Sequence, residues 1–591
     1  MLSNRLVIGL DYGTTYTGVA FCETSDTGVI GKDILVVKDW PCRHTKIGTK
    51  EKVPSEIALK DPEQWGSLIA PNVQRHMWTK LLLEHSKTGE VDKIIQELSL
   101  ENNGCLSTKP VDIIAQYLAH VKAHLIKNLD IQYTKGLWTT LPITLVVTVP
   151  AVWSDAAKNT TLQAIRNAGF NSTELPQLKR TILTTEPEAA AMYTIQSVRG
   201  GVQDEQFAIG DGFIVCDMGG GTVDLISYRV SDLAPTTLEE ATVGSGDQCG
   251  GSFVERGFLK WLERRLGTAD FVLIVGERSE DLPRTSLSTK LNRMVQDFIL
   301  EAKSCFSGIE TNFLRLPVPL SSVEDDEKRG IQDGEIKITA DDMKEMFEFP
   351  LRRTYELLLE QIREARRAHN VELKSVFMVG GFSESPYMYE KIKAFAEAEG
   401  LQAIRPAHAW SAIVRGAAVK GLEGDGRAPI KNRKCRRSYG TDYDTQFIPG
   451  VHKEADSYFS RHEQAKRALH QMEWLLEKGQ DLAANAEFHG DHEFYQRFKQ
   501  GGSRVRSLKL FATDFDKAPR RSKDRGVYHV ATLNIDFNVV PQSAFRLCVS
   551  PDGSTSYYRL DFKVEISVQS SLEFSLLVNG VRYGAVTADY A

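Results

Sequence analysis

Two stretches of the chain share a pattern that is suited to binding phosphate. Each is a short apolar segment that ends in an aspartate, Asp11 or Asp217, and continues into a turn of glycine and threonine. Glycine lets the backbone approach a ligand closely, successive N–H groups point into the concavity of the turn, and threonine hydroxyls add donors. The two turns contain Gly13, Thr14 and Thr15 in the first stretch, and Gly219, Gly220, Gly221 and Thr222 in the second.

The aspartate that ends each apolar segment is a candidate metal-binding residue. Carboxylates hold Mg²⁺ most often through its water shell, so Asp11 and Asp217 would each lie beside bound phosphates. One glycine-rich turn is weak evidence by itself, because most such turns only connect two strands. The occurrence of the same pattern twice favours a phosphate site built from two related halves.

A third glycine pair follows another apolar segment. Gly380 and Gly381 come directly after residues 376–379 and open a helix. Backbone N–H groups at a helix N-terminus can approach a ligand where no side chain intervenes. We expect this turn to present its backbone to a flat group such as adenine or ribose.

The elements that must position these turns are typical of an α/β chain. Apolar runs rich in Val and Ile alternate with longer helical patterns, as in sheets whose strands are buried on both faces. One run, residues 144–149, is followed by Pro150, a predicted N-cap at Ser154 and Asp155, and a helix that ends at Gly169. We predict two half-domains over residues 1–423, each opening with a hairpin, the second beginning near residue 205.

A change of composition marks the main domain boundary. Residues 424–445 are rich in glycine and basic side chains, which predicts a linker. Beyond it, residues 446–591 contain one predicted helix at 462–478 and several segments in which apolar and polar residues alternate. Such alternation, with Asn579-Gly580 as a turn, predicts an antiparallel sheet and hence a β-rich C-terminal domain. The helix prediction depends on the spacing of Ala465, Leu469, Met472 and Leu476.

Composition excludes several classes of protein. The 591 residues are 42% hydrophobic and 25% charged, with a net charge of −6, which is ordinary for a globular protein and unlike a generally basic nucleic-acid binder. The eight cysteines are scattered singly, so neither a zinc site nor a disulfide framework is expected. No run reaches the ~18 apolar residues of a membrane span. We expect a cytoplasmic protein.

The motifs resemble those of the actin-like ATPase superfamily and, within it, of the heat-shock-70 chaperones. The resemblance covers about residues 1–421, with the motifs in the family's order. It implies a duplicated, ribonuclease H-like domain of two lobes that hold ATP or ADP with Mg²⁺. The chain looks most similar to the divergent group-12 branch, which lacks the long helical lid. The matching motifs are residues 11–16, 148–155, 185–191, 217–224 and 379–386.

The resemblance also assigns roles to individual residues. Asp11 and Asp217 would hold the hydrated metal, while Glu186 and Asp224 would order its shell and the attacking water. The alternative interpretation of Glu186 is an exposed carboxylate at the start of a helix, without a role in the site. The residues that would bind the nucleotide are Gly13, Thr14, Thr15, Tyr16, Gly219, Gly220, Gly221, Thr222, Lys303, Ser307, Gly380, Gly381 and Phe382, although Phe382 fits a core position equally well.

Three departures from the family pattern affect the expected activity. The family has a lysine close to the γ-phosphate, and its match here falls on Ala70 or Pro71, so we predict weak or slow ATP hydrolysis. The segment at residues 300–307 matches the helix with which the family binds adenosine. It lacks the family's stacking arginine and the carboxylate that binds the ribose. The apolar linker that conveys nucleotide state is replaced by the basic run 431–437, whose simplest reading is a solvated linker.

Three functions are compatible with this sequence. The first is an ATP-binding chaperone whose C-terminal domain binds an unfolded polypeptide client or a protein partner. The second is a small-metabolite kinase of the same superfamily, which would need a carboxylate base beside a polar substrate pocket. The third is a nucleotide-bound scaffold that hydrolyses little or nothing.

Overall fold

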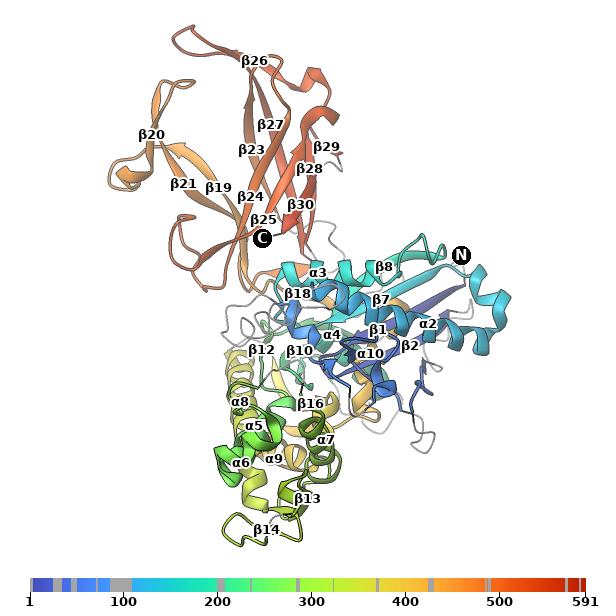
Figure 1. The fold of residues 1–591 in the computed structure, drawn as a ribbon. Helices are drawn as coiled ribbons and strands as arrows, with labels where there is room; N and C mark the ends of the chain where they lie inside the picture. Colours follow the sequence, from blue (N-terminus) through green and yellow to red (C-terminus); the bar gives the residue numbers. More distant parts are fainter. Residues whose placement is uncertain are drawn as a thin grey trace. The chain divides into compact units, whose positions relative to one another are not determined.

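A computed structural model gives the course of the chain, which Figure 1 shows. The chain divides into a first unit, Met1–Pro429, and a second unit, Ile430–Ala591. The predicted start of a second half-domain near residue 205 and residues 424–429 of the predicted linker lie outside the described residues. The described residues are 4–24, 34–43, 50–70, 73–84, 109–198, 208–233, 236–282, 287–322, 324–367, 371–422, 430–483, 486, 490–568, 572–583 and 586–590.

The first sheet of the first unit places the Asp11 turn at the tip of a hairpin. Its strands are β1 (Arg5–Tyr12), β2 (Tyr16–Thr24), β3 (Leu35–Val36), β4 (Val53–Pro54), β7 (Ile143–Val149) and β8 (Leu178–Thr185). The order is β3-β2-β1-β7-β8, with β4 paired to β2. β1 runs antiparallel to β2 and parallel to β7, and its apolar residues Leu6, Ile8 and Leu10 are buried. A separate short pair is formed by β5 (Ile57–Ala58) and β6 (Arg75–His76).

The second sheet repeats this local arrangement around the Asp217 turn. Its strands are β9 (Asp211–Met218), β10 (Val223–Leu233), β11 (Thr236–Glu240), β12 (Ser245–Asp247), β16 (Glu372–Val379) and β17 (Gln402–Ile404). β9 runs antiparallel to β10 and parallel to β16, as β1 does to β2 and β7. A small separate sheet consists of β13 (Asn312–Arg315), β14 (Ile331–Gln332) and β15 (Glu335–Ile338).

Helices accompany both sheets, so the first unit has the mixed α/β fold that the sequence predicts. The helix predicted after Ser154 is confirmed, because the Ser154 hydroxyl accepts a hydrogen bond of 3.2 Å from the Ala157 N–H at the start of α3. The helices are α2 (Pro110–Leu137), α3 (Asp155–Asn167), α4 (Glu186–Val198), α5 (Ser252–Leu266), α6 (Thr268–Val275), α7 (Thr289–Asp297), α8 (Ala340–Arg367), α9 (Pro386–Ala398) and α10 (Ala412–Leu422).

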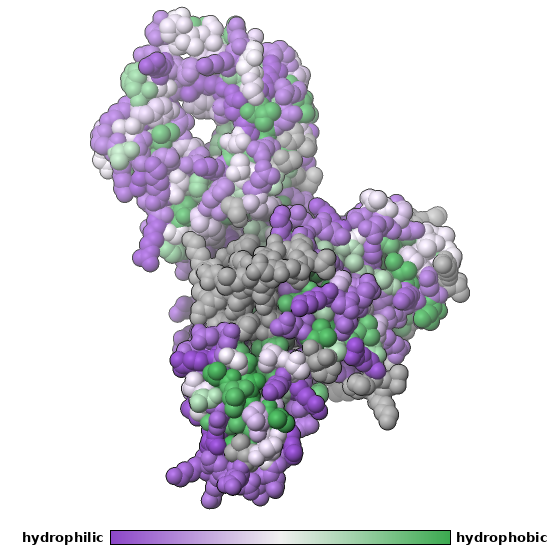
Figure 2. All heavy atoms as spheres, in the orientation of Figure 1, coloured by the Kyte–Doolittle hydropathy of each residue, from purple (hydrophilic) through white to green (hydrophobic). Residues whose placement is uncertain are grey.

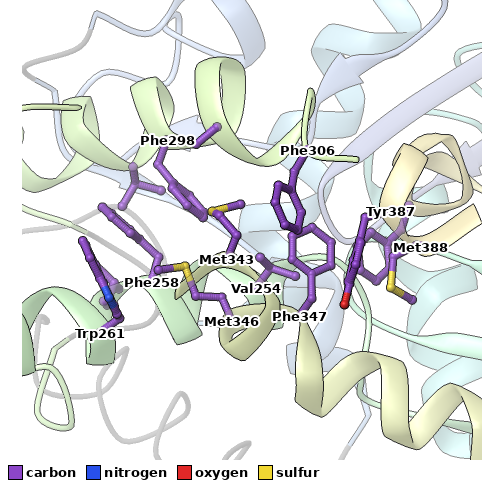
Figure 3. Close-up of a cluster of buried hydrophobic side chains, with 14 of the residues drawn as sticks. Val254, Phe258, Trp261, Phe298, Phe306, Met343, Met346, Phe347, Tyr387 and Met388 are labelled. Atoms are coloured by element: carbon purple, nitrogen blue, oxygen red, sulfur yellow. The ribbon is translucent and has the colours of Figure 1, made fainter. Parts of the chain in front are cut away.

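Aromatic side chains fill the core beside the second sheet. Figure 3 shows this cluster, in which the rings of Phe258 and Phe298 stack with their centroids 4.1 Å apart. Phe298 begins η5 (Phe298–Lys303), a π-helical turn that directly follows α7. Such turns shift the helical register and occur often at functional sites. Here the turn buries Phe298 and Ala302 and ends at Lys303, one of the residues that the resemblance assigns to the nucleotide.

The second unit consists mainly of two antiparallel sheets that share one hydrophobic core. The first has the order β20-β21-β19-β24-β25-β30, and the second β23-β27-β28-β29, with β26 paired to β27. The predicted turn is confirmed, since Asn579 and Gly580 have φ values of 50° and 78° between β28 and β29. The strands are β18 (Ile430–Lys434), β19 (Ser438–Gln446), β20 (Ser457–Ser460), β21 (Ala465–Leu476), β22 (Asp481–Ala483), β23 (Gly490–Phe498), β24 (Val505–Thr513), β25 (Val527–Asp536), β26 (Arg546–Val549), β27 (Ser556–Val568), β28 (Leu572–Val578), β29 (Val581–Tyr583) and β30 (Val586–Tyr590).

The helix predicted over residues 462–478 is wrong, because this segment forms strand β21, paired with β19. Apolar residues four apart, such as Met472 and Leu476, fit both a helical turn and the strand period of two. Both of these side chains are buried in the strand. A bulge adds one residue to β21, and His470 there has a φ of 62°. The extra residue shifts the alternation of buried and exposed side chains along the strand. Leu469, which is 38% exposed, lies three residues before Met472, a spacing that resembles a helix.

The predicted linker is also wrong over its described part, residues 430–445. These residues form β18 and nearly all of β19, and β18 pairs antiparallel with β22. The basic side chains did not reveal a strand because the ladder is made by backbone groups. One of them, Lys434, forms an ion pair of 2.7 Å with Asp481, its partner across the ladder.

Polar side chains cover much of the surface seen in Figure 2. Apolar side chains gather on the face over α5 and α6, where Leu273 is 60% exposed. Among the described helices, none combines the length and the apolar character that crossing a bilayer requires.

The packing of α10 against α4 requires a glycine, and this contact supports the helix that begins at Glu186. A Cβ on Gly416 of α10 would lie 1.7 Å from the backbone oxygen of Ala189 in α4. We predict that Gly416→Ala lowers the free energy of unfolding by ~1–3 kcal/mol or more, because a backbone atom cannot move aside easily. Urea denaturation followed by tryptophan fluorescence measures this.

The matched control for this prediction is Gly136→Ala, near the end of α2, where an added Cβ would meet no atom within 4 Å. It should stabilise by up to ~1 kcal/mol, since alanine loses less backbone entropy in a helix than glycine does. Equal effects of the two substitutions would contradict the packing argument.

Candidate functional site

The two glycine–threonine turns face each other in the first unit. A Cβ on Gly220 would lie 2.2 Å from the Thr15 hydroxyl oxygen, and one on Gly221 would lie 2.6 Å from that of Thr14. Both turns are closed by the same hydrogen bond. The N–H of Gly13 donates to the Tyr16 carbonyl at 3.1 Å, and that of Gly219 donates to the Thr222 carbonyl at 3.0 Å. The structure therefore brings together the two predicted phosphate-binding segments and explains why neither second-turn glycine can carry a side chain.

The second turn rests on the N-terminus of α5. The N–H groups of Gly250, Gly251 and Ser252 donate to carbonyl oxygens of residues 219–221 at 2.8 to 3.1 Å. These bonds use the carbonyl side of the turn. Within the described chain, the N–H groups of Gly220 and Gly221 have no such partner. Donors in this state at a glycine turn suit an anionic ligand.

Asp11, at the end of β1, is buried and has hydrogen bonds on both carboxylate oxygens. Lys52 Nζ lies 2.6 Å from Oδ2, and the Thr148 hydroxyl donates to Oδ1 at 2.8 Å. Burial favours the protonated acid, but the ammonium groups of Lys52 and Lys80 and these hydrogen bonds outweigh it. The pKa of Asp11 therefore lies below its ordinary value. Thr148 lies in a motif that the resemblance includes, whereas Lys52 was not predicted.

Asp217, at the end of β9, is in the opposite electrostatic state. Its Oδ1 is buried and has no hydrogen-bond partner in the described part of the chain. Burial raises the pKa of Asp217 well above its ordinary value, and the negative charges of Glu186, Asp224 and Asp11 raise it further. A buried carboxylate oxygen without a donor, among other carboxylates, is the environment in which a cation is stabilising.

Glu186 is buried, so the reading of an exposed helix-start carboxylate is wrong. It is the first residue of α4 and forms a buried ion pair with Lys80. Burial raises the pKa of Glu186 to about 7, with Lys80 opposing the rise and Asp11 and Asp224 adding to it. Asp224 lies directly across the hairpin from Asp217. The four predicted catalytic and metal residues thus form one electrostatic group.

Lys80 is a lysine of this site that the sequence analysis did not identify. It lies in η2 (Thr79–Leu83), a 3-10 helix that is held to β1 by a hydrogen bond of 2.6 Å between the Thr79 and Tyr12 hydroxyls. The lysine was expected at residue 70 or 71, of which Pro71 lies outside the described residues. The sequence did carry a signal, because Lys80 is a single charge within the apolar run 77–83 and such a charge needs a buried partner. Slow hydrolysis stays a prediction, and Lys80 is the lysine that the structure places beside Glu186.

The predicted adenosine residues lie at several places around the third glycine pair. Gly380 has a φ of 82°, and a Cβ on it would lie 2.5 Å from the orphan oxygen of Asp217. Phe382 is buried and stacks on Phe347, a core position. Lys303 Nζ lies 5.7 Å from the Phe382 ring and bonds Glu255 at 2.6 Å.

Ser307 lies beside this group, and its backbone N–H and hydroxyl both donate to Glu310. Trp410 was not predicted as part of this site. Its indole lies 3.0 Å from where a Cβ on Gly381 would be and packs edge-on against Tyr16, with ring centroids 5.6 Å apart. Burial raises the pKa of Tyr16 to about 12.

A cation–π contact joins α5 to the residue that precedes η2. The Arg256 guanidinium of α5 lies 5.2 Å from the ring centroid of Trp78 and 4.6 Å from that of Phe253. Trp78 directly precedes η2 and has a φ of 56°. The contact therefore connects the helix that supports the second glycine turn with the segment that carries Lys80.

The residues present fit a divalent cation beside phosphate. The fit depends on the orphan Oδ1 of Asp217 and on the N–H groups of Gly220 and Gly221, which have no backbone partner within the described chain. Among the described residues, no group of three or more His, Cys, Asp or Glu side chains is arranged to hold a metal by direct ligation.

The fold and the site agree with the comparison with known proteins. The family model described as Hsp70 protein matches residues 92–431, more than half of the chain, so the chain belongs to the Hsp70 family. Its curated relatives include the heat shock 70 kDa proteins 12A and 12B of Homo sapiens. The 12A protein is 24% identical over 522 residues and the 12B protein 23% identical over 526, each match covering 76% of this chain and 73% of the relative. The chaperone protein DnaK of Ureaplasma parvum serovar 3 is 23% identical over 425 residues, covering 71% of this chain and 58% of DnaK.

The ion pair between Lys80 and Glu186 gives a prediction that needs no ligand. We predict that Lys80→Met lowers the free energy of unfolding by ~3–5 kcal/mol, because it leaves a buried carboxylate without its cation. Glu186 binds its proton more tightly in the folded than in the unfolded chain, so its ionisation costs stability as the pH rises from its unfolded pKa towards its folded value. Loss of Lys80 raises that folded value further, and the variant should lose more stability than the wild type between about pH 5 and pH 8.

Urea denaturation at both pH values measures this effect. The double variant Lys80→Met with Glu186→Gln removes both charges and should recover most of the loss. A pH-independent defect in Lys80→Met, or no recovery in the double variant, would contradict a charge-based role for the pair.

Proposed function

We propose that the first unit binds ATP or ADP with Mg²⁺ between two related halves, as an actin-like ATPase domain of the Hsp70 family. The observation that supports this most strongly is the pair of facing turns, each closed by the same hydrogen bond and each preceded by a buried aspartate. The repeated hairpin and parallel neighbour in the two sheets fit a duplicated domain.

Each residue of the site has a separate role in this proposal. The N–H groups of Gly220 and Gly221 and the hydroxyls of the turn threonines would donate to phosphate oxygens. Asp217 would hold the cation, which when bound neutralises phosphate charge. Glu186 and Asp224 would orient the attacking water, and the Lys80 ammonium would stabilise negative charge that develops on the phosphate.

The first test is nucleotide binding by two turn variants. Gly220→Ala should weaken ADP and ATP binding by about tenfold or more, because its Cβ overlaps the Thr15 side chain and the turns must separate. Thr222→Val should weaken binding by about tenfold through the loss of one donor. Isothermal titration calorimetry measures both, with Gly136→Ala as a control for folding. Wild-type affinity in both variants would refute the assignment of the turns.

The second test separates hydrolysis from binding. We expect Lys80→Met to reduce the single-turnover rate of ATP hydrolysis by ~10²- to 10³-fold, the usual effect of losing one preorganised charge donor, while the affinity for ATP changes less. Radiolabelled ATP with excess protein measures the rate. A wild-type protein that binds ATP but hydrolyses none of it would favour the scaffold function instead.

We also propose that the second unit binds a polypeptide client or protein partner. Support for this is the family relationship together with sheets whose outermost strands, such as β20 and β30, pair on one side within their own sheet. Such edges accept an extended peptide through main-chain hydrogen bonds, which need no special client sequence. Peptide-array binding to the full chain, with and without Mg-ATP, tests this, and no binding in either state would indicate a scaffold role.

A further inference from the structure

Lys52 is a second buried ammonium group in the site, and the proposed function gives it no role. Its side chain is 6% exposed, and Nζ lies 2.6 Å from Asp11 Oδ2. The hydrocarbon part of the side chain runs along the first hairpin at Gly18, where a Cβ would lie 3.3 Å from both Cγ and Cε of Lys52. The missing side chain at Gly18 therefore leaves room for the stem of Lys52 beside Asp11.

The ammonium of Lys52 has donors to spare. A lysine ammonium carries three N–H donors, and the hydrogen bond of Nζ within the described residues goes to Asp11 alone. A buried cation with two unused donors is costly unless an acceptor completes its shell. Asp11 leads directly into the first glycine turn, so phosphate oxygens bound there would lie close enough to serve as that acceptor.

The two aspartates that begin the turns are therefore not equivalent. Asp11 has a hydrogen bond on each oxygen, one of them from a fixed cation, whereas Asp217 keeps one oxygen without a donor. A divalent ion held equally by both would have to compete with Lys52 at Asp11. At Asp217 no described side chain donates to Oδ1, although the Lys52 ammonium also acts on this carboxylate through its charge.

We propose that Lys52 is a tethered cation for the bound phosphates, supplying on the Asp11 side positive charge that would otherwise come from the metal. The metal then belongs to the Asp217 side, and nucleotide affinity depends only weakly on Mg²⁺. This inference rests on the proposed nucleotide site and adds a residue and a metal dependence to it.

The experiment measures ADP and ATP affinity with excess Mg²⁺ and with excess EDTA. Removal of Mg²⁺ should weaken wild-type binding by less than about tenfold. In Lys52→Met, which keeps the stem and removes the charge, the same removal should weaken binding by about 10- to 100-fold more than in the wild type, since one charged donor is lost. Lys52→Arg keeps the charge and should retain the weak metal dependence.

The control is Lys420→Met, which removes another largely buried lysine, one that lies 3.3 Å from Glu188 rather than on Asp11. It should leave the Mg²⁺ dependence unchanged. Melting temperatures of all variants identify any that fail to fold, and the wild-type comparison needs no variant.

Each outcome decides. A wild-type affinity that falls by more than about tenfold without Mg²⁺ would overturn the proposal, and so would a Lys52→Met protein with the wild-type dependence, which would make Lys52 a structural ion-pair partner only. Both results would leave the nucleotide site intact. Absence of nucleotide binding by the wild type even with Mg²⁺ would instead refute the proposed function and this inference with it.

Discussion

The electrostatic balance among buried charges is the constraint on which the rest of the site depends. Asp11, Asp217, Asp224 and Glu186 lie within mutual electrostatic reach, all largely shielded from water. Collecting like charges in a medium of low dielectric is strongly unfavourable unless cations accompany them. Among the described residues, Lys52 and Lys80 supply this positive charge, each paired with a carboxylate. The elements that carry these side chains hold the four carboxylates in place against their mutual repulsion, and they are strand ends, a helix start and a short 3-10 helix packed on β1.

The site also requires glycine, because the backbone segments around these charges approach neighbouring atoms too closely for a side chain at Gly220, Gly221 or Gly380. The two turns approach so closely that Thr14 and Thr15 occupy the positions where Cβ atoms of Gly221 and Gly220 would be. Gly380 similarly keeps the space beside Asp217 open. The three glycine segments thus approach one another through contacts between glycine backbone and the side chains of Thr14, Thr15 and Asp217.

Patterns that are local in the sequence were predictable here, and pairings between distant segments were not. The strands before Asp11 and Asp217, the N-cap at Ser154 and the Asn579-Gly580 turn follow from short-range rules of burial, capping and φ. Lys80 was missed because counting residues from a motif fails when the intervening loop differs in length. Lys52 could be assigned only after β4 was placed beside β2. In β21, a spacing of four residues between apolar side chains fits a helix as well as a strand. Only the pairing with β19 distinguishes the two.

The contact between Arg256 and Trp78 bears on how fast α5 and the Trp78 segment separate. Separation of α5 from the Trp78 segment breaks the contact between the guanidinium and the indole. Such contacts are worth ~0.5–2 kcal/mol depending on how well they are shielded from water, a factor of roughly 2 to 30 in a rate. Any motion that separates these two elements is therefore slowed by two side chains that lie outside the glycine turns. Substitution of Arg256 or Trp78 can therefore change the rate at which these elements separate without altering any residue of the two glycine turns.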